Sequence, residues 1–192
     1  AGNWTIGDIT VDLGEGATFD MDLSSEVTAD SGFLSTIGDV TIGNVMLTQG
    51  SGADVSISLD VDADASGDGS GIVGNVMLGD VTSVMGLSSS LDIDVSVSAS
   101  GTGTMTHIGS VTVGNVTLSS DAAGLQADAT LDIDVDSDRT IGAVMVGDVD
   151  VDFLDDSTFD YDIAITAGTA NDGAVGPVML GDVDVVADSN TY

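Results

Sequence analysis

The sequence predicts an all-β tandem-repeat β-solenoid, and the first sign of this fold is a recurring segment. The form aliphatic-Gly-x-Val/Ile-x-aliphatic begins at Ile6, Ile37, Val73, Ile108, Ile141 and Val175, with separations of 31, 36, 35, 33 and 34 residues. A fixed period of about 20 to 50 residues is typical of proteins whose repeats bury their apolar faces against their neighbours. We therefore expect a single domain over residues 1–192, built of about six ~34-residue units that start near residues 5, 36, 72, 107, 140 and 174.

The second sign is a strict alternation of apolar and polar residues between these segments. Residues 91–98 read Leu-Asp-Ile-Asp-Val-Ser-Val-Ser, and similar runs cover residues 19–23, 55–63, 131–135 and 159–165. A two-residue period places apolar side chains on one face of a strand and polar side chains on the other. Alternation does not distinguish parallel from antiparallel pairing, so an antiparallel β-sandwich is the alternative fold. The repetition of the units favours the solenoid.

The Gly-containing segments allow two interpretations. In residues 37–47 a pattern of aliphatic residue, Gly, Asp or Asn, Val, and Met or Thr occurs twice in succession. One interpretation is a pair of short strands joined at a bend, where Gly permits a bulge or a close backbone approach and Asp or Asn bonds to its own local backbone. The other is a coil with five-residue sides, since the pattern resembles the quintets of pentapeptide-repeat proteins.

The composition excludes several classes of partner. The chain has 33 acidic residues against a single Arg and no Lys, and its formal net charge is -32. Nucleic acids and anionic membrane surfaces attract Lys and Arg, so neither is expected as a partner. Hydrophobic residues make up 42% of the chain, enough for a core, but the chain lacks the apolar run of about 18 residues that membrane insertion requires. Ala in place of Met at residue 1 favours a mature secreted chain, outside the cell or on its surface.

The aspartates predict cation binding on one face. If equivalent strands stack about 4.8 Å apart, outward Asp residues form ladders in which each pair costs on the order of 1 kcal/mol in water. One basic side chain cannot neutralise them, so bound cations or a saline medium must, and Ca²⁺ accepts about six to eight oxygen ligands. The residues predicted to bind Ca²⁺ are Asp60, Asp62, Asp64, Asp68, Asp92, Asp94, Asp132, Asp134 and Asp136.

Groups suited to catalysis are sparse, so we do not expect an enzyme. His107 is the only imidazole, and no Gly-x-Ser-x-Gly motif accompanies it. Arg139 alone would have to supply the basic side chain that a β-helix lyase uses. The Asp residues recur so regularly that no pair stands out as the two carboxylates of a glycosidase.

The ends of the sequence suggest an assembly function. The chain contains more Gly-containing segments than alternating runs, and neither end has the composition of a polar cap. Open sheet edges pair with other chains, and a head-to-tail contact that does not close on itself produces a fibre. We therefore expect a homopolymeric extracellular filament. The residues expected at its contacts are Trp4, Ile6, Ile9, Val178, Leu180, Val183 and Val185.

The Gly-Asp/Asn-rich, Lys-free repeats resemble those of secreted bacterial pilus-system and β-solenoid surface proteins. This resemblance implies a structural role in a fimbria-like or other surface filament. The alternative function is a monomeric calcium-dependent adhesin or spacer module, which would remain soluble and monodisperse with calcium present. An ice-binding solenoid is less favoured, because the alternating runs mix Asp and Ser and lack regular rows of Thr.

Overall fold

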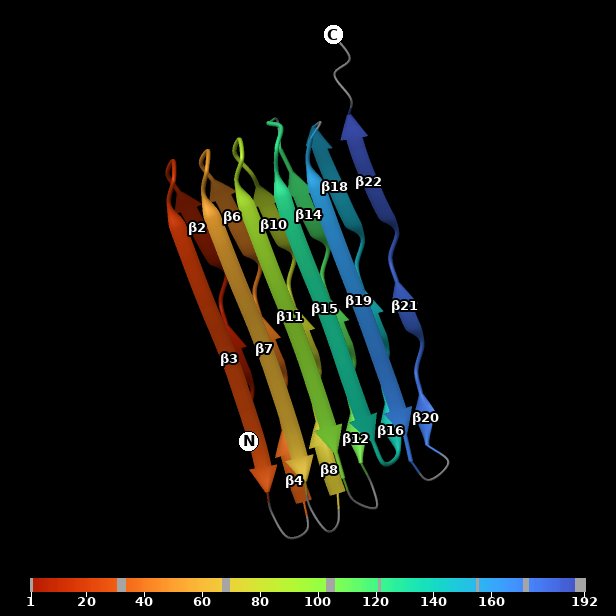
Figure 1. The fold of residues 1–192 in the computed structure, drawn as a ribbon. Helices are drawn as coiled ribbons and strands as arrows, with labels where there is room; N and C mark the ends of the chain where they lie inside the picture. Colours follow the sequence, from red (N-terminus) through yellow and green to blue (C-terminus); the bar gives the residue numbers. More distant parts are fainter. Residues whose placement is uncertain are drawn as a thin grey trace.

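A computed structural model shows a parallel β-solenoid of about five turns (Figure 1). It describes residues 2–30, 34–66, 70–102, 106–120, 122–154, 156–170 and 173–188. Every strand pair in the four sheets is parallel, and each strand pairs with its equivalent one turn away in the chain. Parallel pairing excludes the antiparallel sandwich and confirms the predicted solenoid.

The first layer of the solenoid consists of long strands, and we call it the long-strand layer. Its five strands form one continuous sheet. They are β3 (Thr18–Asp30), β7 (Asp54–Ser66), β11 (Ser90–Gly101), β15 (Gln126–Ser137) and β19 (Thr158–Thr169). The alternating runs of the sequence all lie in these strands, so they are correctly predicted.

The opposite layer consists of short strands that follow one another in line with bends between them, and we call it the broken layer. Three sheets make it up. The first contains β1 (Trp4–Ile6), β5 (Val40–Ile42), β9 (Val76–Leu78), β13 (Val111–Val113), β17 (Val144–Val146) and β21 (Val178–Leu180). The second contains β2 (Ile9–Leu13), β6 (Val45–Gln49), β10 (Val81–Val84), β14 (Val116–Ser119), β18 (Val149–Leu154) and β22 (Val183–Asp188). The third contains β4 (Leu34–Ile37), β8 (Ser70–Val73), β12 (His107–Ile108), β16 (Thr140–Ile141) and β20 (Ala174–Val175).

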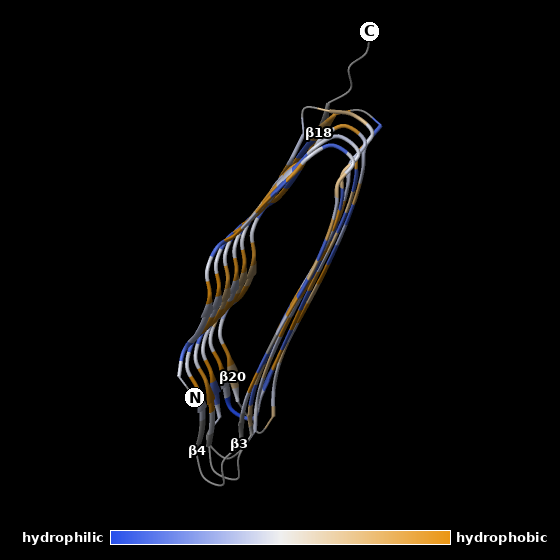
Figure 2. Cartoon of the chain, turned by 90° about the vertical axis from the view of Figure 1, so that its left-hand side faces the viewer, coloured by the Kyte–Doolittle hydropathy of each residue, from blue (hydrophilic) through white to orange (hydrophobic). Residues whose placement is uncertain are grey.

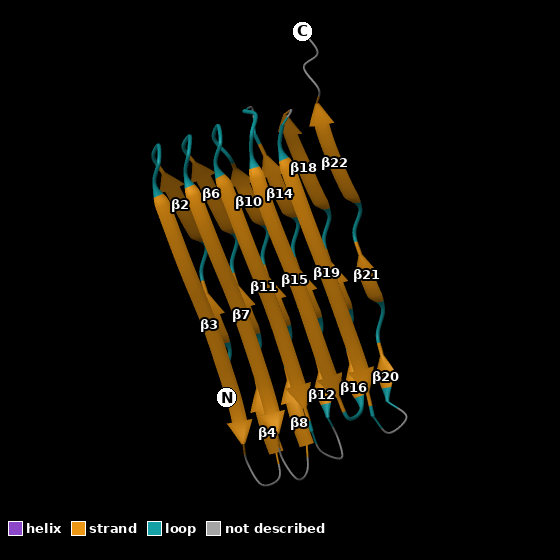
Figure 3. Ribbon diagram, viewed as in Figure 1, coloured by secondary structure: helices purple, strands orange, loops and turns teal. Residues whose placement is uncertain are grey.

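The chain passes along the broken layer, turns, and returns along the long-strand layer. Figure 2 shows the two layers edge-on, one wavy and one straight, and Figure 3 shows the short loops that separate consecutive broken strands. The turn into each long strand contains one residue with positive φ: Gly16, Gly52, Ser88, Gly124 and Asp156. We call each passage along the broken layer, such as β8–β9–β10, a rung. The described residues contain six rungs but five long strands.

The register corrects the spacing of the first repeat. Ile6 pairs with Ile42, which lies 36 residues later, and not with Ile37. The sequence pattern matched Ile6 to Ile37 because both precede a Gly-Asp pair, but Ile37 ends β4, a strand that has no counterpart among the described residues of the first rung. The first two turns are therefore 36 residues long, and the later turns are 35, 33 and 34 residues long, close to the ~34 expected.

The core lies between the two layers and is predominantly apolar, with six buried polar side chains among the described residues. In β11 every second residue points inward and is buried, namely Leu91, Ile93, Val95, Val97 and Ala99. The facing rungs contribute valines, isoleucines and leucines at the same period, as in Val76 and Leu78. Burial of this kind contributes about 25 cal/mol per Å² of apolar surface, so the repeated core is the main source of stability.

Candidate functional site

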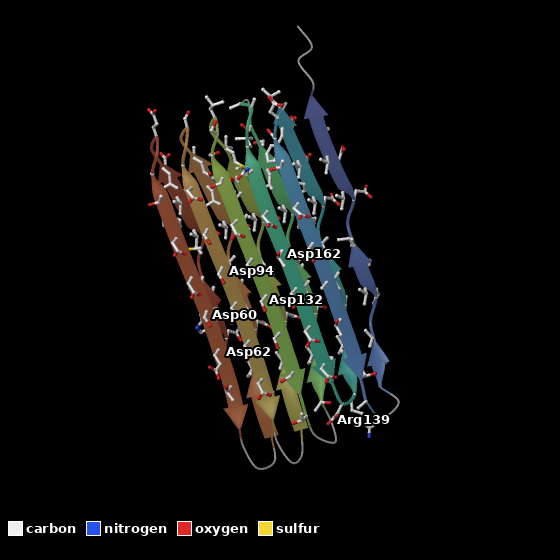
Figure 4. The ribbon with its side chains drawn as sticks, viewed as in Figure 1. Asp60, Asp62, Asp94, Asp132, Arg139 and Asp162 are labelled. Atoms are coloured by element: carbon white, nitrogen blue, oxygen red, sulfur yellow. The ribbon has the colours of Figure 1, made fainter. Side chains whose placement is uncertain are left out.

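The outer surface of the long-strand layer is acidic. Asp60, Asp62, Asp94, Asp132 and Asp162 project from this face, as Figure 4 shows. All of them occupy outward positions of the alternation, between apolar residues that face the core. The sequence therefore places them on one face correctly. Asp68, another predicted ligand, lies outside the described residues.

The predicted ladders of adjacent carboxylates are wrong for most of these residues, because the register inserts a hydroxyl between them. Ser96 lies between Asp60 and Asp132 on the neighbouring strands. The same order holds for Asp62–Ser98–Asp134, Asp64–Ser100–Asp136, Asp22–Ser58–Asp94 and Asp94–Thr130–Asp162. Carboxylates in a row therefore lie two strands apart at most positions.

The alternation has a clear electrostatic reason. Two carboxylates about 5 Å apart repel each other by about 0.8 kcal/mol in water, and doubling the separation halves that figure before salt screens it further. The intervening hydroxyl also donates a hydrogen bond: Ser100 Oγ lies 2.9 Å from Asp64 Oδ1. Ser90 Oγ, which lies between Asp54 and Gln126, likewise donates to Asp54 Oδ1. The sequence contains this signal, since β7 and β15 carry Asp where β11 carries Ser, but only the register reveals it.

At two places on this face, carboxylates on neighbouring strands are adjacent, with no hydroxyl residue between them. Asp92, Asp128 and Asp160 occupy adjacent strands in one row, beside a shallow hollow of about 700 Å³ that they help to line. Glu26 is the direct partner of Asp62. The pKa of Asp62 is raised above its usual 3.8, chiefly because partial burial disfavours the charge, and further because Asp64, Asp60 and Glu26 are nearby. The hydrogen bond from Ser98 opposes this shift.

The described part of the chain contains no group of three or more acidic or His side chains arranged to hold a metal ion. Asp60, Asp62 and Asp64 follow one another along a strand, and so do Asp132, Asp134 and Asp136, at every second residue. Residues two apart in a strand are separated by about 6.6 Å, too far for their carboxylates to converge closely on one ion without rearrangement. Calcium binding at these residues, and at Asp92 and Asp94, stays a prediction.

A second set of Asp residues stabilises the bends of the broken layer. Asp8 Oδ1 accepts a hydrogen bond from the backbone N–H of Asn44, its equivalent one turn later, at 2.9 Å. The bonds continue from Asn44 to Asp80, Asn115, Asp148 and Asp182, each at 2.8 or 2.9 Å. We call this series the Asx ladder. Such a bond contributes about 1 kcal/mol, and more where the acceptor is charged.

The Asx ladder alternates in charge over its first five residues, Asp8, Asn44, Asp80, Asn115 and Asp148, and the alternation ends there because the next residue is Asp182. The shorter ladder at the other bend runs Asn3, Asp39 and Asn75. Each of the first three rungs therefore has one charged and one neutral bend. Sequence reasoning identified the Gly-Asp and Gly-Asn pairs as bend signals but missed both the ladders and their alternation. The predicted bend in these segments is confirmed, but the predicted bonding of Asp or Asn to its own local backbone is wrong, because these side chains accept hydrogen bonds from backbone one turn away. The pentapeptide coil is not observed among the described residues.

Glycine precedes each ladder residue because the turns approach closely there. A Cβ on Gly43 would lie 2.5 Å from Asp8 Oδ1, and one on Gly79 would lie 2.5 Å from Asn44 Oδ1. In each case the obstructing atoms belong to the preceding rung, so the missing Cβ of every such Gly points along the solenoid toward the N-terminal edge. In the first rung a Cβ on Gly7 would meet nothing within 4 Å, and Gly7 is not among the residues with positive φ.

The residues predicted to form assembly contacts all lie in the two edge rungs. Trp4, Ile6 and Ile9 are partly buried and pack against the core. Val178, Leu180, Val183 and Val185 continue rows whose members in the preceding rung are buried, but these four are 49–51% exposed. The structure therefore brings the seven residues to opposite edges of the solenoid, three at one and four at the other.

No protein-family model, curated protein or solved structure matches this chain. The solenoid fold and the tandem repeat therefore come from the sequence and the structure alone. In the part of the chain that is described, no helix is long and apolar enough to cross a membrane.

The sole His lies on the third sheet of the broken layer, and the sole Arg lies in the bend that leads into that sheet. His107 is exposed on β12, and its Nδ1 lies 2.7 Å from Thr140 Oγ1 on β16. Arg139 directly precedes Thr140 and is exposed in the connection between β15 and β16 (Figure 4). Neither side chain is near the stacked row of Asp92, Asp128 and Asp160, which lies at the start of the long strands.

Proposed function

We propose that the chain is a structural subunit of an extracellular filament in which copies stack head to tail, rung upon rung. The observation that carries this proposal is the match between the two edge rungs. The first rung contains a Gly-Asx bend at Gly7-Asp8, and the last contains one at Gly181-Asp182. A copy translated along the solenoid would therefore stack its Gly7-Asp8 bend on Gly181-Asp182, just as equivalent bends stack in the inner turns.

The backbone groups at the two edges are complementary. Inside the solenoid, Val149 N–H donates to Asp182 O at 2.8 Å and Gly181 N–H donates to Val146 O at 2.9 Å. Repeating the pattern across a junction pairs Val183 N–H with Asp8 O of the next copy. It also pairs Gly7 N–H of that copy with Leu180 O. Edge strands with unpaired backbone groups are ready templates for such pairing.

Gly7 gives independent support. Gly7 lies in the bend between β1 and β2, and neither a positive φ nor a close contact in the first rung requires glycine there. In every other rung the same Gly avoids the preceding Asx side chain. A copy stacked on the N-terminal edge would place its Asp182 side chain against residue 7, and this contact would explain why residue 7 is Gly.

The charge distribution favours growth along one axis. Acidic side chains cover the outer surface of the long-strand layer, whereas apolar Val and Leu are exposed at the C-terminal edge. Lateral contact between copies through their long-strand layers is therefore opposed by repulsion, while the edges attract each other. Cations or salt outside the cell would screen the faces, and Ca²⁺ is the proposed cation, held weakly in the millimolar range that is typical of extracellular sites (on the order of 10⁻⁴–10⁻³ M).

Negative-stain electron microscopy of the 192-residue chain tests the proposal. We expect unbranched fibres of uniform width in the presence of salt and millimolar calcium. Gly7→Ala should abolish the fibres without destabilising the subunit, because its Cβ would meet the neighbouring copy alone. Thr5→Ala is the matched control, since Thr5 faces outward in the same rung, and it should form fibres like the wild type.

Monodisperse particles from the wild-type chain under all conditions would overturn the filament and favour a monomeric spacer or adhesin module. Fibres of unchanged length with Gly7→Ala would show that copies join through a different surface.

A further inference from the structure

The outer face of the broken layer carries little charge, in contrast to the acidic face of the long-strand layer. We call the outer face of the second to fifth rungs, residues 36–48, 72–84, 107–119 and 140–152, the rung face. Its first three rungs contain two acidic residues, Asp39 and Asp80, whereas β7, β11 and β15 contain four, two and four. A chain of net charge -32 therefore repels a second copy least at this face.

Apolar side chains are exposed on the same face. Met46, Met77 and Val84 are 52%, 45% and 48% exposed, at outward positions of β6, β9 and β10. Outside the last rung, the one other large apolar side chain exposed among the described residues is Leu87, in the turn after β10. Exposed apolar side chains that are rimmed by polar residues are typical of a contact with another protein.

The rung face is large enough for a stable contact. Figure 2 shows that successive rungs follow the same course, so the face keeps one profile from rung to rung. Each rung contributes thirteen residues, and at about 3.3 Å per residue and about 4.8 Å per rung the four rungs cover roughly 800 Å². A standard specific interface buries about 800 Å² on each partner.

The bends of the rungs indicate how a second copy fits. A two-fold axis parallel to the solenoid, above the middle of the first sheet, places the first bend of each rung opposite the second bend of the same rung in the other copy. Asp39 then faces Asn44, and Asn75 faces Asp80. The bend carboxylates of these rungs thus meet amides, which donate hydrogen bonds, and do not meet one another.

The same axis brings the one basic side chain opposite a carboxylate. In the fifth rung the two bend residues are Ala143 and Asp148. Arg139 lies four residues before Ala143, and Asp152 lies four residues after Asp148. The axis therefore places Arg139 of each copy opposite Asp152 of the other. Both residues are exposed, so two ion pairs form in each contact.

Apolar side chains meet in the third rung. Met77 lies between the bend residues Asn75 and Asp80, so it lies close to the axis and faces Met77 of the other copy. Ile72 lies three residues before the first bend residue and Val84 four residues after the second, so these two also come together between copies. The centre of the contact is therefore apolar and its ends are polar, as in typical interfaces.

We propose that a second copy of this chain binds the rung face back to back, related by a two-fold axis parallel to the solenoid. The two acidic long-strand layers then lie on opposite outer sides of the pair. Such a contact uses the same face on both copies and closes on itself. The inference does not rest on the filament, because its residues lie within inner rungs and not at the edges. In a filament it would join two parallel rows of subunits.

Disulfide cross-linking tests the pairing, because the chain contains no Cys. Met77→Cys lies close to the axis and should form a disulfide-linked dimer under mild oxidation in about 0.15 M NaCl, as measured on a non-reducing gel. Leu87→Cys is the matched control, since Leu87 is 52% exposed but lies outside the rung face, and it should stay monomeric. Equal yields from the two variants would overturn the inference.

The orientation has its own test. In an antiparallel pair, with the order of the rungs reversed, Met77 would meet Thr112 of the next rung. A dimer that forms only when Met77→Cys and Thr112→Cys chains are mixed would therefore overturn the parallel arrangement.

A charge exchange assigns the ion pair. Arg139→Asp should weaken the dimer at least about tenfold in Kd by sedimentation velocity, because two attractive pairs become repulsive. Adding Asp152→Arg to the same chain should restore the dimer. Within one copy the two residues lie at opposite ends of the fifth rung, so a restored Kd can arise only between copies. An unrestored dimer would overturn this contact.

Fibre formation is scored separately by microscopy. Cross-linked Met77→Cys dimers without fibres would refute the filament and leave the pairing intact. Fibres without these dimers would refute the pairing alone.

Discussion

Ser100 on β11 donates a hydrogen bond to Asp64 on β7, with 2.9 Å between Ser100 Oγ and Asp64 Oδ1. On its other side Ser100 is the register partner of Asp136. One hydroxyl thus separates two carboxylates that would otherwise be closer to each other. Because this arrangement recurs along the acidic face, the register itself limits the repulsion expected from a chain of net charge -32.

Replacing this hydroxyl with a third carboxylate should destabilise the fold. Ser100→Asp creates two adjacent like-charge pairs and removes one hydrogen bond, so we expect a loss of about 1–2 kcal/mol at low ionic strength. Urea unfolding followed by far-UV circular dichroism measures the change. Most of the loss should disappear in about 1 M NaCl, where the Debye length is about 3 Å. Ser100→Asn is the uncharged control, and an equal, salt-independent loss with Asn would indicate a steric cause.

Asp62 should destabilise the folded state at neutral pH. Its pKa is raised above 3.8, first by burial and then by Asp64, Asp60 and Glu26. Because the folded state holds this proton more tightly than the unfolded state, stability falls as pH rises from 3.8 through the folded pKa and stays lower above it. Asp62→Asn should therefore stabilise the protein by roughly 0.5 kcal/mol at pH 7, a modest value because the site is partly solvated.

Denaturant unfolding between pH 3 and pH 7 measures the effect of Asp62→Asn. The gain should vanish at the acidic end of the range, where the wild-type carboxyl is protonated. Asp132→Asn is the control, since Ser96 and Ala164 are its register partners. A larger gain at Asp132 than at Asp62 would contradict this account of the acidic face.

The close approach of the turns predicts a large difference between two equivalent glycines. A Cβ on Gly79 would lie 2.5 Å from Asn44 Oδ1 and 2.8 Å from Gly43 C, whereas one on Gly7 has open space. Gly79→Ala should cost about 2–3 kcal/mol through overpacking, and Gly7→Ala should change the stability of the dispersed subunit by well under about 1 kcal/mol. Thermal unfolding measures the stability of the two variants. Similar losses of stability in both would show that the glycines are required for backbone conformation and not for the close approach of the turns.

The fold could be predicted from sequence because its period and alternation are local signals. Residues 91–98 alternate strictly, and β11 has that alternation in the structure. The length of the first turn could not be predicted, since Ile6 and Ile37 precede similar Gly-Asp pairs although they lie in non-equivalent strands. Only strand pairing distinguishes them.

The acidic face was predictable in position but not in arrangement. Alternation shows that Asp60 and Asp132 point outward, but it does not show which residue of β11 lies between them. That depends on the lengths of two successive turns, which place Ser96 beside both residues. The Asx ladder was hidden for a related reason, since its bonds join residues 33–36 apart.

Tyr161 predicts a specific loss of stability in alkali. Its hydroxyl is buried without a hydrogen-bond partner among the described residues, and burial raises its pKa above 10.0. The unfolded chain therefore releases this proton first, so stability falls as pH rises through 10.0. Tyr161→Phe should remove that fall and add up to about 1 kcal/mol at neutral pH. The chain has no Lys, so few other groups titrate there, and an unchanged alkaline profile in the variant would contradict the assignment.

Calcium and sodium should have separable effects on the acidic face. The alternating register leaves repulsion that any salt can screen, so NaCl should raise the melting temperature steadily. If the predicted Asp residues also bind Ca²⁺ weakly, millimolar CaCl₂ should raise it further than NaCl of equal ionic strength, and excess chelator should reverse only that additional part. The triple variant Asp132→Asn, Asp134→Asn, Asp136→Asn should lose most of the calcium-specific increase and keep the response to NaCl. Identical melting curves in the two salts at matched ionic strength would refute calcium binding and leave screening as the way in which this chain tolerates its charge.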